Sequence, residues 1–185
     1  MKPSNVELEE KVKFNLPQDY YCGLYILDDN LLVIYQRSIS IIRNAFDGIR
    51  HEPDPEPFIE MQDYYSYEPP QVVRDKSGRI WCSIGGRMFF KDNVDDKWTE
   101  TKGFHIGDSD PLVLDNGLIV FSTNYQHDTE NEGIIIFNPD TAEAKFVAVD
   151  GLGKSPVPKR QLPDGRLMIE DAVTSVHKYL DISNI

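Results

Sequence analysis

The chain has 185 residues with 31 acidic and 19 basic side chains, so its formal net charge is -12 and its pI is near 4.7. This balance argues against nucleic acid as a direct partner, because affinity for phosphate backbones comes largely from Lys and Arg. The chain has two cysteines without metal-type spacing and no apolar run of about 18 residues, which favours a cytoplasmic protein with no membrane segment.

The first predicted strand covers residues 10–16 and precedes four copies of one pattern. Each copy has an apolar strand, a tight turn with Asp, Asn or Gly, and a second apolar strand. The copies are 24–35, 72–84, 112–121 and 160–170, with Asn30, Gly78, Gly117 and Gly165 aligned at separations of 48, 39 and 48 residues. This spacing is close to the ~40–50 residues of propeller blades, and the turn residues favour hairpins.

Each copy continues as a blade should, which predicts blades at approximately 23–62, 71–102, 111–150 and 159–182. In the first blade the outer strand is either 49–52 or 57–62, and the sequence leaves both open. The last blade lacks a fourth strand, so we expect the strand at 10–16 to complete it. Such closure leaves no exposed sheet edge in the ring.

Over nearly its whole length the chain therefore resembles a small four-bladed β-propeller repeat protein. The resemblance implies one all-β domain, residues 1–185, closed by the N-terminal strand. A β-sandwich built from the same four hairpins is the alternative.

Acids and tyrosines concentrate in the connections that a propeller places on one rim, namely those between second and third strands and those between blades. Exposed tyrosines supply contact area at interfaces, and acids around them attract a basic surface. We call this set the acidic rim and predict that it binds a partner. It comprises Asp19, Tyr20, Tyr21, Asp63, Tyr64, Tyr65, Tyr67, Glu68, Asp108, Asp110, Tyr125, Asp128, Glu130 and Glu132.

Two long windows around this rim contain carboxylates and neither Lys nor Arg. Residues 51–71 hold six carboxylates, and residues 103–144 hold eight. Such runs are also typical of solvated loops, but these two flank the same predicted rim.

No catalytic residue, metal site or cofactor is predicted. The four histidines have no zinc-type spacing, and residues 92–96 lack the pattern of a calcium loop, which favours a polar hairpin turn there. The rim offers two groupings suited to acid–base chemistry, His105 with Asp108 and His127 with Asp128 and Glu130.

Size, acidity and rim composition resemble those of bacterial immunity proteins, such as those of contact-dependent growth inhibition systems. The resemblance implies a non-enzymatic binding protein whose basic partner is a toxin nuclease. Two alternatives remain open: a propeller that binds a small ligand or carbohydrate on the same rim, and a hydrolase or lyase that uses a His–carboxylate pair.

Overall fold

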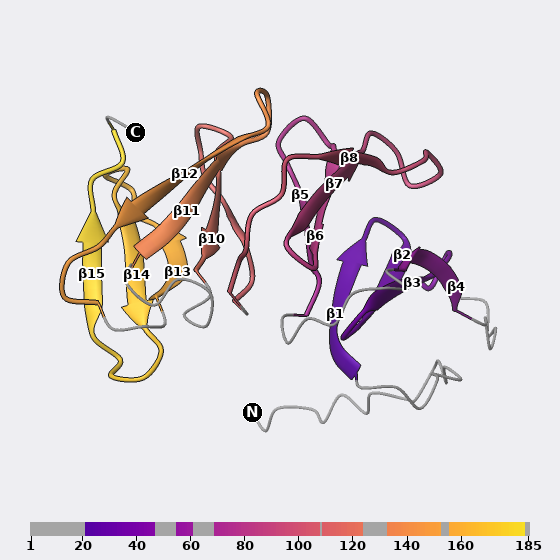
Figure 1. The fold of residues 1–185 in the computed structure, drawn as a ribbon, viewed down its shortest axis with the longest axis horizontal. Coiled ribbons are helices and arrows are strands. Elements are labelled where there is room, and N and C mark those ends of the chain that lie inside the picture. Colours follow the sequence, from indigo (N-terminus) through magenta and orange to yellow (C-terminus); the bar gives the residue numbers. More distant parts are fainter. Residues whose placement is uncertain are drawn as a thin grey trace, which may run out of the picture. The chain divides into compact units, whose positions relative to one another are not determined.

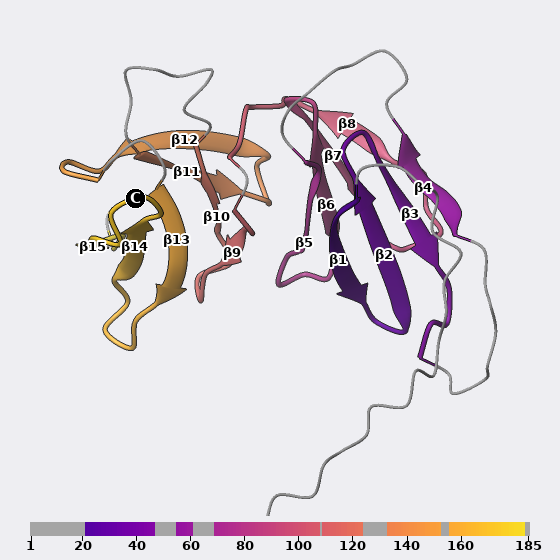
Figure 2. The ribbon, with the colours of Figure 1, turned by 90° about the horizontal axis from the view of Figure 1, so that it is seen from below.

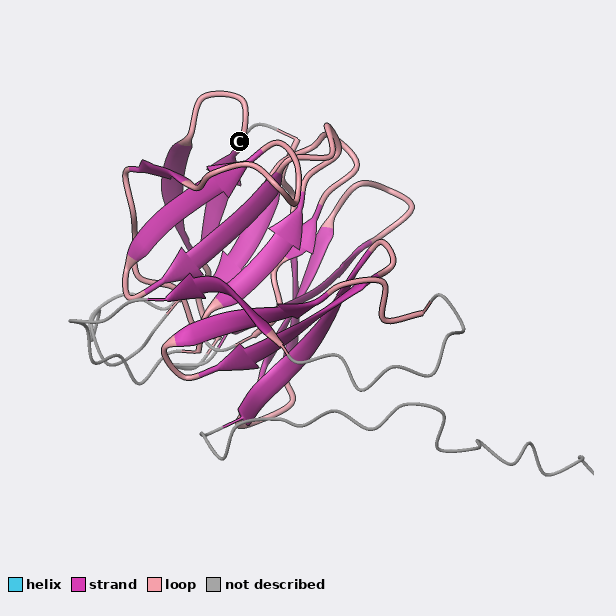
Figure 3. Cartoon of the chain, turned by 90° about the vertical axis from the view of Figure 1, so that its right-hand side faces the viewer, coloured by secondary structure: helices cyan, strands magenta, loops and turns pink. Residues whose placement is uncertain are grey.

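The computed structural model describes residues 21–46, 55–60, 69–107, 109–123, 133–152 and 156–183. Within these ranges every regular element is a β-strand (Figure 3), as the all-β prediction requires. The same ranges contain no helix with the length and apolarity that a membrane crossing needs. The chain divides into two compact units, Met1–Asp63 and Tyr64–Ile185.

The first unit holds one antiparallel sheet with its strands in chain order, β1-β2-β3-β4 (Figure 1). The strands are β1 (Tyr21–Leu27), β2 (Asn30–Tyr35), β3 (Ser38–Ile42) and β4 (Glu56–Glu60). Strand β4 overlaps the second of the two ranges predicted for the outer strand, 57–62. Its Phe58 is buried and its Ile59 pairs with Ile39 of β3, so apolar packing selects this segment.

The second unit holds three antiparallel sheets. The first has the order β5-β6-β7-β8, with β5 (Gln71–Arg74), β6 (Ile80–Ile84), β7 (Arg87–Lys91) and β8 (Thr99–Thr101). The second has the order β12-β11-β10-β9, with β9 (Leu112–Val113), β10 (Ile119–Ser122), β11 (Gly133–Asn138) and β12 (Glu143–Ala148). The third has the order β13-β14-β15, with β13 (Pro156–Gln161), β14 (Leu167–Asp171) and β15 (His177–Leu180).

The three predicted Gly turns of this unit have the same hydrogen-bond pattern. The amides of Gly78, Gly117 and Gly165 donate to the carbonyls three residues earlier, at 3.1, 3.0 and 2.9 Å. All three glycines have φ near +90°, at +94°, +89° and +87°, a backbone region that L side chains rarely adopt. The predicted repeat is therefore a repeat in backbone geometry as well as in sequence.

The turn at Asn30 in the first unit is different. Leu27 pairs directly with Asn30, so only Asp28 and Asp29 form the turn, and Asp28 has a φ of +56°. Asp and Asn tolerate this left-handed region better than most residues, which explains why no glycine is needed. The side chain of Asn30 donates to the carbonyl of Leu27 at 3.2 Å and accepts from the amide of Asn44 at 3.2 Å.

An aromatic cluster packs the β5–β8 sheet against the β9–β12 sheet. Trp81, which is 1% exposed, meets Phe137 edge-on with ring centroids 4.8 Å apart. Phe104, in the connection after β8, meets Phe121 at 5.5 Å. In the β5–β8 sheet, Cys82 is fully buried, and burial raises the pKa of its thiol.

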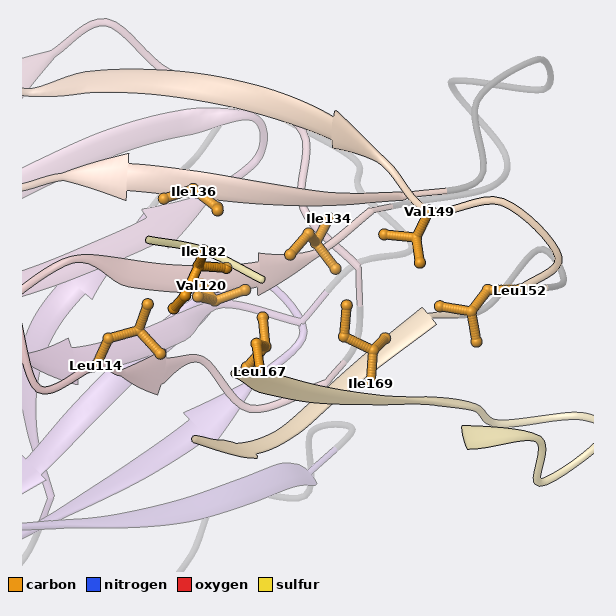
Figure 4. Close-up of a cluster of buried hydrophobic side chains, with 9 residues drawn as sticks. All are labelled: Leu114, Val120, Ile134, Ile136, Val149, Leu152, Leu167, Ile169 and Ile182. Carbon is orange, nitrogen blue, oxygen red and sulfur yellow. The ribbon is translucent and has the colours of Figure 1, made fainter. Parts of the chain in front are cut away.

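An aliphatic cluster packs the β9–β12 sheet against the β13–β15 sheet. Figures 1 and 2 show these two sheets side by side. Figure 4 shows its nine side chains gathered between the strands of the two sheets. They are Leu114, Val120, Ile134, Ile136, Val149, Leu152, Leu167, Ile169 and Ile182.

The described part of the last sheet has three strands, with β15 at its edge. A turn from Asp171 to Val176 precedes β15: the amide of Ser175 donates to the carbonyl of Asp171 at 2.8 Å. Strand β15 therefore begins only after this turn, at His177. The predicted closing strand, 10–16, lies outside the described residues.

Candidate binding surface

Most of the acidic rim lies outside the described residues. These residues are Asp19, Tyr20, Asp63, Tyr64, Tyr65, Tyr67, Glu68, Asp108, Tyr125, Asp128, Glu130 and Glu132. Of the other two, Tyr21 begins β1, and Asp110 is exposed just before β9. Among the described residues, the backbone around Asp110 is therefore the part of the chain that places an exposed acid of this rim.

The connection between β8 and β9 brings two sheets of the second unit together at one end of their strands. Gly103 lies against the β6–β7 turn: a Cβ atom there would lie 2.1 Å from the carbonyl oxygen of Gly86. Gly107 donates its amide to the carbonyl of Ser122, at the end of β10, at 2.9 Å. A Cβ atom on Gly107 would lie 2.5 Å from Oγ of Ser122, so both approaches require glycine.

His105 lies between these two glycines and is exposed. Its imidazole ring covers Gly86, where a Cβ atom would lie 2.7 Å from Cε1 of His105. Its predicted partner Asp108 and the second predicted grouping, around His127, lie outside the described residues. Both groupings therefore stay predictions.

A different His–carboxylate pair is present in the last sheet. Nε2 of His177 lies 3.0 Å from Oε2 of Glu170, and Nζ of Lys159 lies 3.4 Å from the other carboxylate oxygen. The contact with His177 is the largest influence on Glu170 and holds the pKa of its carboxyl below the usual range. Sequence spacing did not reveal this pair; it follows from the β14–β15 register, which places Glu170 opposite His177.

Basic side chains from outside the two carboxylate windows compensate part of their charge. Nε of Arg43 lies 3.1 Å from Glu56, and Nζ of Lys76 lies 4.0 Å from Asp115. These are exposed pairs, which contribute little to stability. The windows are therefore less uniformly negative in the fold than in the sequence.

Within the described ranges no group of three or more His, Cys, Asp or Glu side chains forms a metal site. The segment 92–96 forms a polar turn, as predicted. The amide of Asn93 donates to Oδ2 of Asp96 at 2.9 Å, and the amide of Asp96 donates to the carbonyl of Asn93 at 3.1 Å.

A groove of about 610 Å³ opens in the second unit, between the chain that follows β8 and the β9–β12 sheet. We call it the Phe104 groove. Phe104, Leu118 and Ile136 supply large apolar side chains, and two lysines, a glutamate and an asparagine supply polar ones. The complete lining is Lys102, Gly103, Phe104, Leu118, Ile136, Asn138, Ala142, Glu143, Ala144 and Lys145.

No family model and no curated protein matches the sequence. Solved structures do match the fold. Virginiamycin B lyase from Staphylococcus aureus is similar at a TM-score of 0.60 and 15% identity, over 91% of this chain and 58% of the lyase chain. A chain of the nidogen/laminin complex is similar at a TM-score of 0.59 and 19% identity, over 86% of this chain and 60% of that chain. The computationally designed Ika4 protein is similar at a TM-score of 0.56 and 10% identity, over 94% of this chain and 99% of the Ika4 chain.

These likenesses establish the fold class. The chain is a β-propeller protein. Its four antiparallel sheets contain the four predicted hairpins, one in each, and the β-sandwich alternative is wrong. The chain spans a little over half of the length of the lyase chains that it matches. Identities of 15% and below to these lyases concern fold alone, because one propeller architecture serves many unrelated functions.

Proposed function

We propose that this propeller-fold protein is a binding module that neutralises a basic toxin nuclease, in the manner of an immunity protein. The observation that carries the proposal is where the negative charge lies. Eight of the 31 acidic side chains belong to the acidic rim, and the two windows around it, 51–71 and 103–144, hold fourteen carboxylates and neither Lys nor Arg.

The strand order supports one shared location for much of that charge. The connections that carry Asp108, Asp110, Asp128 and Glu130 join β8 to β9 and β10 to β11. The hydrogen bond between Gly107 and Ser122 ties the first of these connections to the strand end where the second begins. Carboxylates gathered there would replace the phosphates of a nuclease substrate, and tyrosines would fill the pockets of its cleft.

The location is tested by reversing rim charges in one variant, Asp63→Lys, Glu68→Lys, Asp128→Lys and Glu130→Lys. The matched control reverses four exposed carboxylates in turns at the other strand ends: Asp29→Lys, Asp115→Lys, Asp140→Lys and Asp164→Lys. Each protein is titrated against purified toxin nuclease domains with a pI above about 9. We expect the rim variant to bind at least about tenfold more weakly than the control, mainly through slower association at low salt. Equal losses of affinity in both variants would contradict the assignment of the partner-binding surface to the acidic rim.

The proposal includes no catalytic step and no cofactor, and it places the protein in the cytoplasm with its partner. Inhibition by binding is stoichiometric, so nuclease activity should fall linearly and vanish at one equivalent. An enzyme that inactivates its target would succeed at substoichiometric amounts. Full inactivation at one tenth of an equivalent would replace the binding proposal with the hydrolase or lyase alternative.

A further inference from the structure

The Phe104 groove has the size and the lining of a small-molecule site. Its volume of about 610 Å³ lies within the roughly 300–1,000 Å³ that is typical of ligand pockets. Phe104 is partly buried and fixed by ring contacts with Phe121 and Phe137, at 5.5 and 5.6 Å. One wall of the groove is therefore a preorganised aromatic surface.

The charge of the groove is opposite to that of the protein. Its lining has two lysines, Lys102 and Lys145, and one carboxylate, Glu143, whereas the whole chain carries -12. Both lysines are exposed, and within the described ranges no carboxylate oxygen lies within 4.0 Å of either ammonium group. A ligand anion would therefore meet cations that are not already paired with described residues.

From this combination we infer that the Phe104 groove binds a small organic anion with an apolar, ring-sized body and one carboxylate, sulfonate or phosphate group. The body contacts Phe104, Leu118 and Ile136, and the anionic group pairs with Lys102 and Lys145. Asn138 adds an amide that hydrogen-bonds polar substituents. The site is separate from the acidic rim, since none of its residues belongs to that set.

The probe for this inference is 8-anilinonaphthalene-1-sulfonate, compared with its uncharged counterpart N-phenyl-1-naphthylamine. Calorimetric titration of the full chain gives stoichiometry and affinity. One variant, Lys102→Glu with Lys145→Glu, reverses the two cations. A second, Ala144→Trp, fills the groove from an exposed position on β12 without changing charge. The control, Lys97→Glu with Arg160→Glu, makes the same change in charge at exposed positions outside the groove.

We expect one sulfonate probe to bind per chain. Its affinity should fall at least about tenfold in both groove variants and stay within about twofold in the control, because charge-assisted contacts and apolar burial are both lost at the groove. The uncharged probe should bind the unmodified protein at least about tenfold more weakly. Thermal unfolding checks that each variant is folded, and Lys102→Gln with Lys145→Gln replaces the reversed pair if that variant does not fold.

Three results would overturn the inference. The first is the absence of one-to-one binding to the unmodified protein. The second is an equal loss of affinity in the groove variants and the control, which would indicate that overall charge governs binding. The third is equal affinity for the two probes, which would indicate an apolar surface without anion recognition.

Discussion

The indole N–H of Trp81 donates a hydrogen bond to the carboxylate of Asp75 at 2.8 Å. The same carboxylate accepts from the amide and the hydroxyl of Ser77, at 2.9 and 2.6 Å, and from the amide of Arg79, at 3.0 Å. One buried acid therefore ties the first turn of the β5–β8 sheet to the largest aromatic side chain of the core.

Asp75→Ala should reduce the free energy of unfolding by about 2–4 kcal/mol, because the buried indole N–H and the turn amides lose their acceptor. Urea-induced unfolding measures the loss. Asp140→Ala is the matched control, since Asp140 is exposed in the β11–β12 turn, and should change stability by less than about 0.5 kcal/mol. Equal effects of the two substitutions would mean that the Asp75 contacts do not stabilise the fold.

Acid should destabilise the protein through carboxyls whose pKa is lowered by folding. Glu170 is such a group because of His177 and Lys159. Asp75 is another: burial opposes its ionisation most strongly, but the hydrogen bonds from Ser77, Trp81 and Arg79 together outweigh burial and lower its pKa. The unfolded chain binds these protons more readily, so stability is present above the unfolded pKa values and is lost as pH falls.

The free energy of unfolding should therefore decrease from about pH 5 downward, below the unfolded pKa values near 4. Glu170→Gln should show a smaller decrease over this interval than the unmodified protein. His177→Gln should also show a smaller decrease, because it removes the largest cause of the shift. Parallel pH profiles for all three proteins would show that this contact does not contribute.

Gly117→Ala tests the backbone geometry of the repeated turn. The added Cβ would meet no atom within 4 Å, so only the φ of +89° opposes it, and the expected loss is about 1–2 kcal/mol. Gly23→Ala is the control, because that glycine also has open space around it but has no left-handed φ. It should be neutral or slightly stabilising. Thermal unfolding of the two variants should thus differ in direction or clearly in size.

Removal of residues 1–16 tests closure by the predicted N-terminal strand. If residues 10–16 complete the last sheet, the truncated protein should lose a large part of its stability, since the edge of β15 loses its partner. Removal of residues 1–8 alone should leave the unfolding midpoint within a few degrees. An unchanged midpoint in the longer truncation would contradict this closure.

Local chemistry made the four hairpins predictable. Gly78, Gly117 and Gly165 indicate a left-handed backbone position, and the apolar runs beside them indicate buried strands. Asn30 has the same polar signature but forms a shorter turn, because the register Leu27–Asn30 leaves only two residues between the strands. The outer strand of the first sheet is not determined by local sequence, because its position depends on the pairing of Ile59 with Ile39 of β3.

The contacts around the acidic windows and the Phe104 groove were less predictable, because they join residues that are distant in sequence. Lys76 pairs with Asp115 across two sheets, and Lys102 and Lys145 line one groove from separate segments. Neither arrangement leaves a spacing signal, since both depend on how one sheet packs on the next. The Glu170–His177 pair depends only on the register of one hairpin, so strand pairing alone is enough to predict it.

Because Cys82 is buried, the chemical reactivity of its thiol reports when the β5–β8 sheet opens. A thiol with a raised pKa at the centre of a sheet reacts only after the sheet separates, because the thiolate is the reactive form. In a Cys22→Ser background, the rate of alkylation at Cys82 under native conditions would therefore measure how often the β5–β8 sheet opens. Comparison with global unfolding would show whether this blade opens alone or only with the rest of the chain.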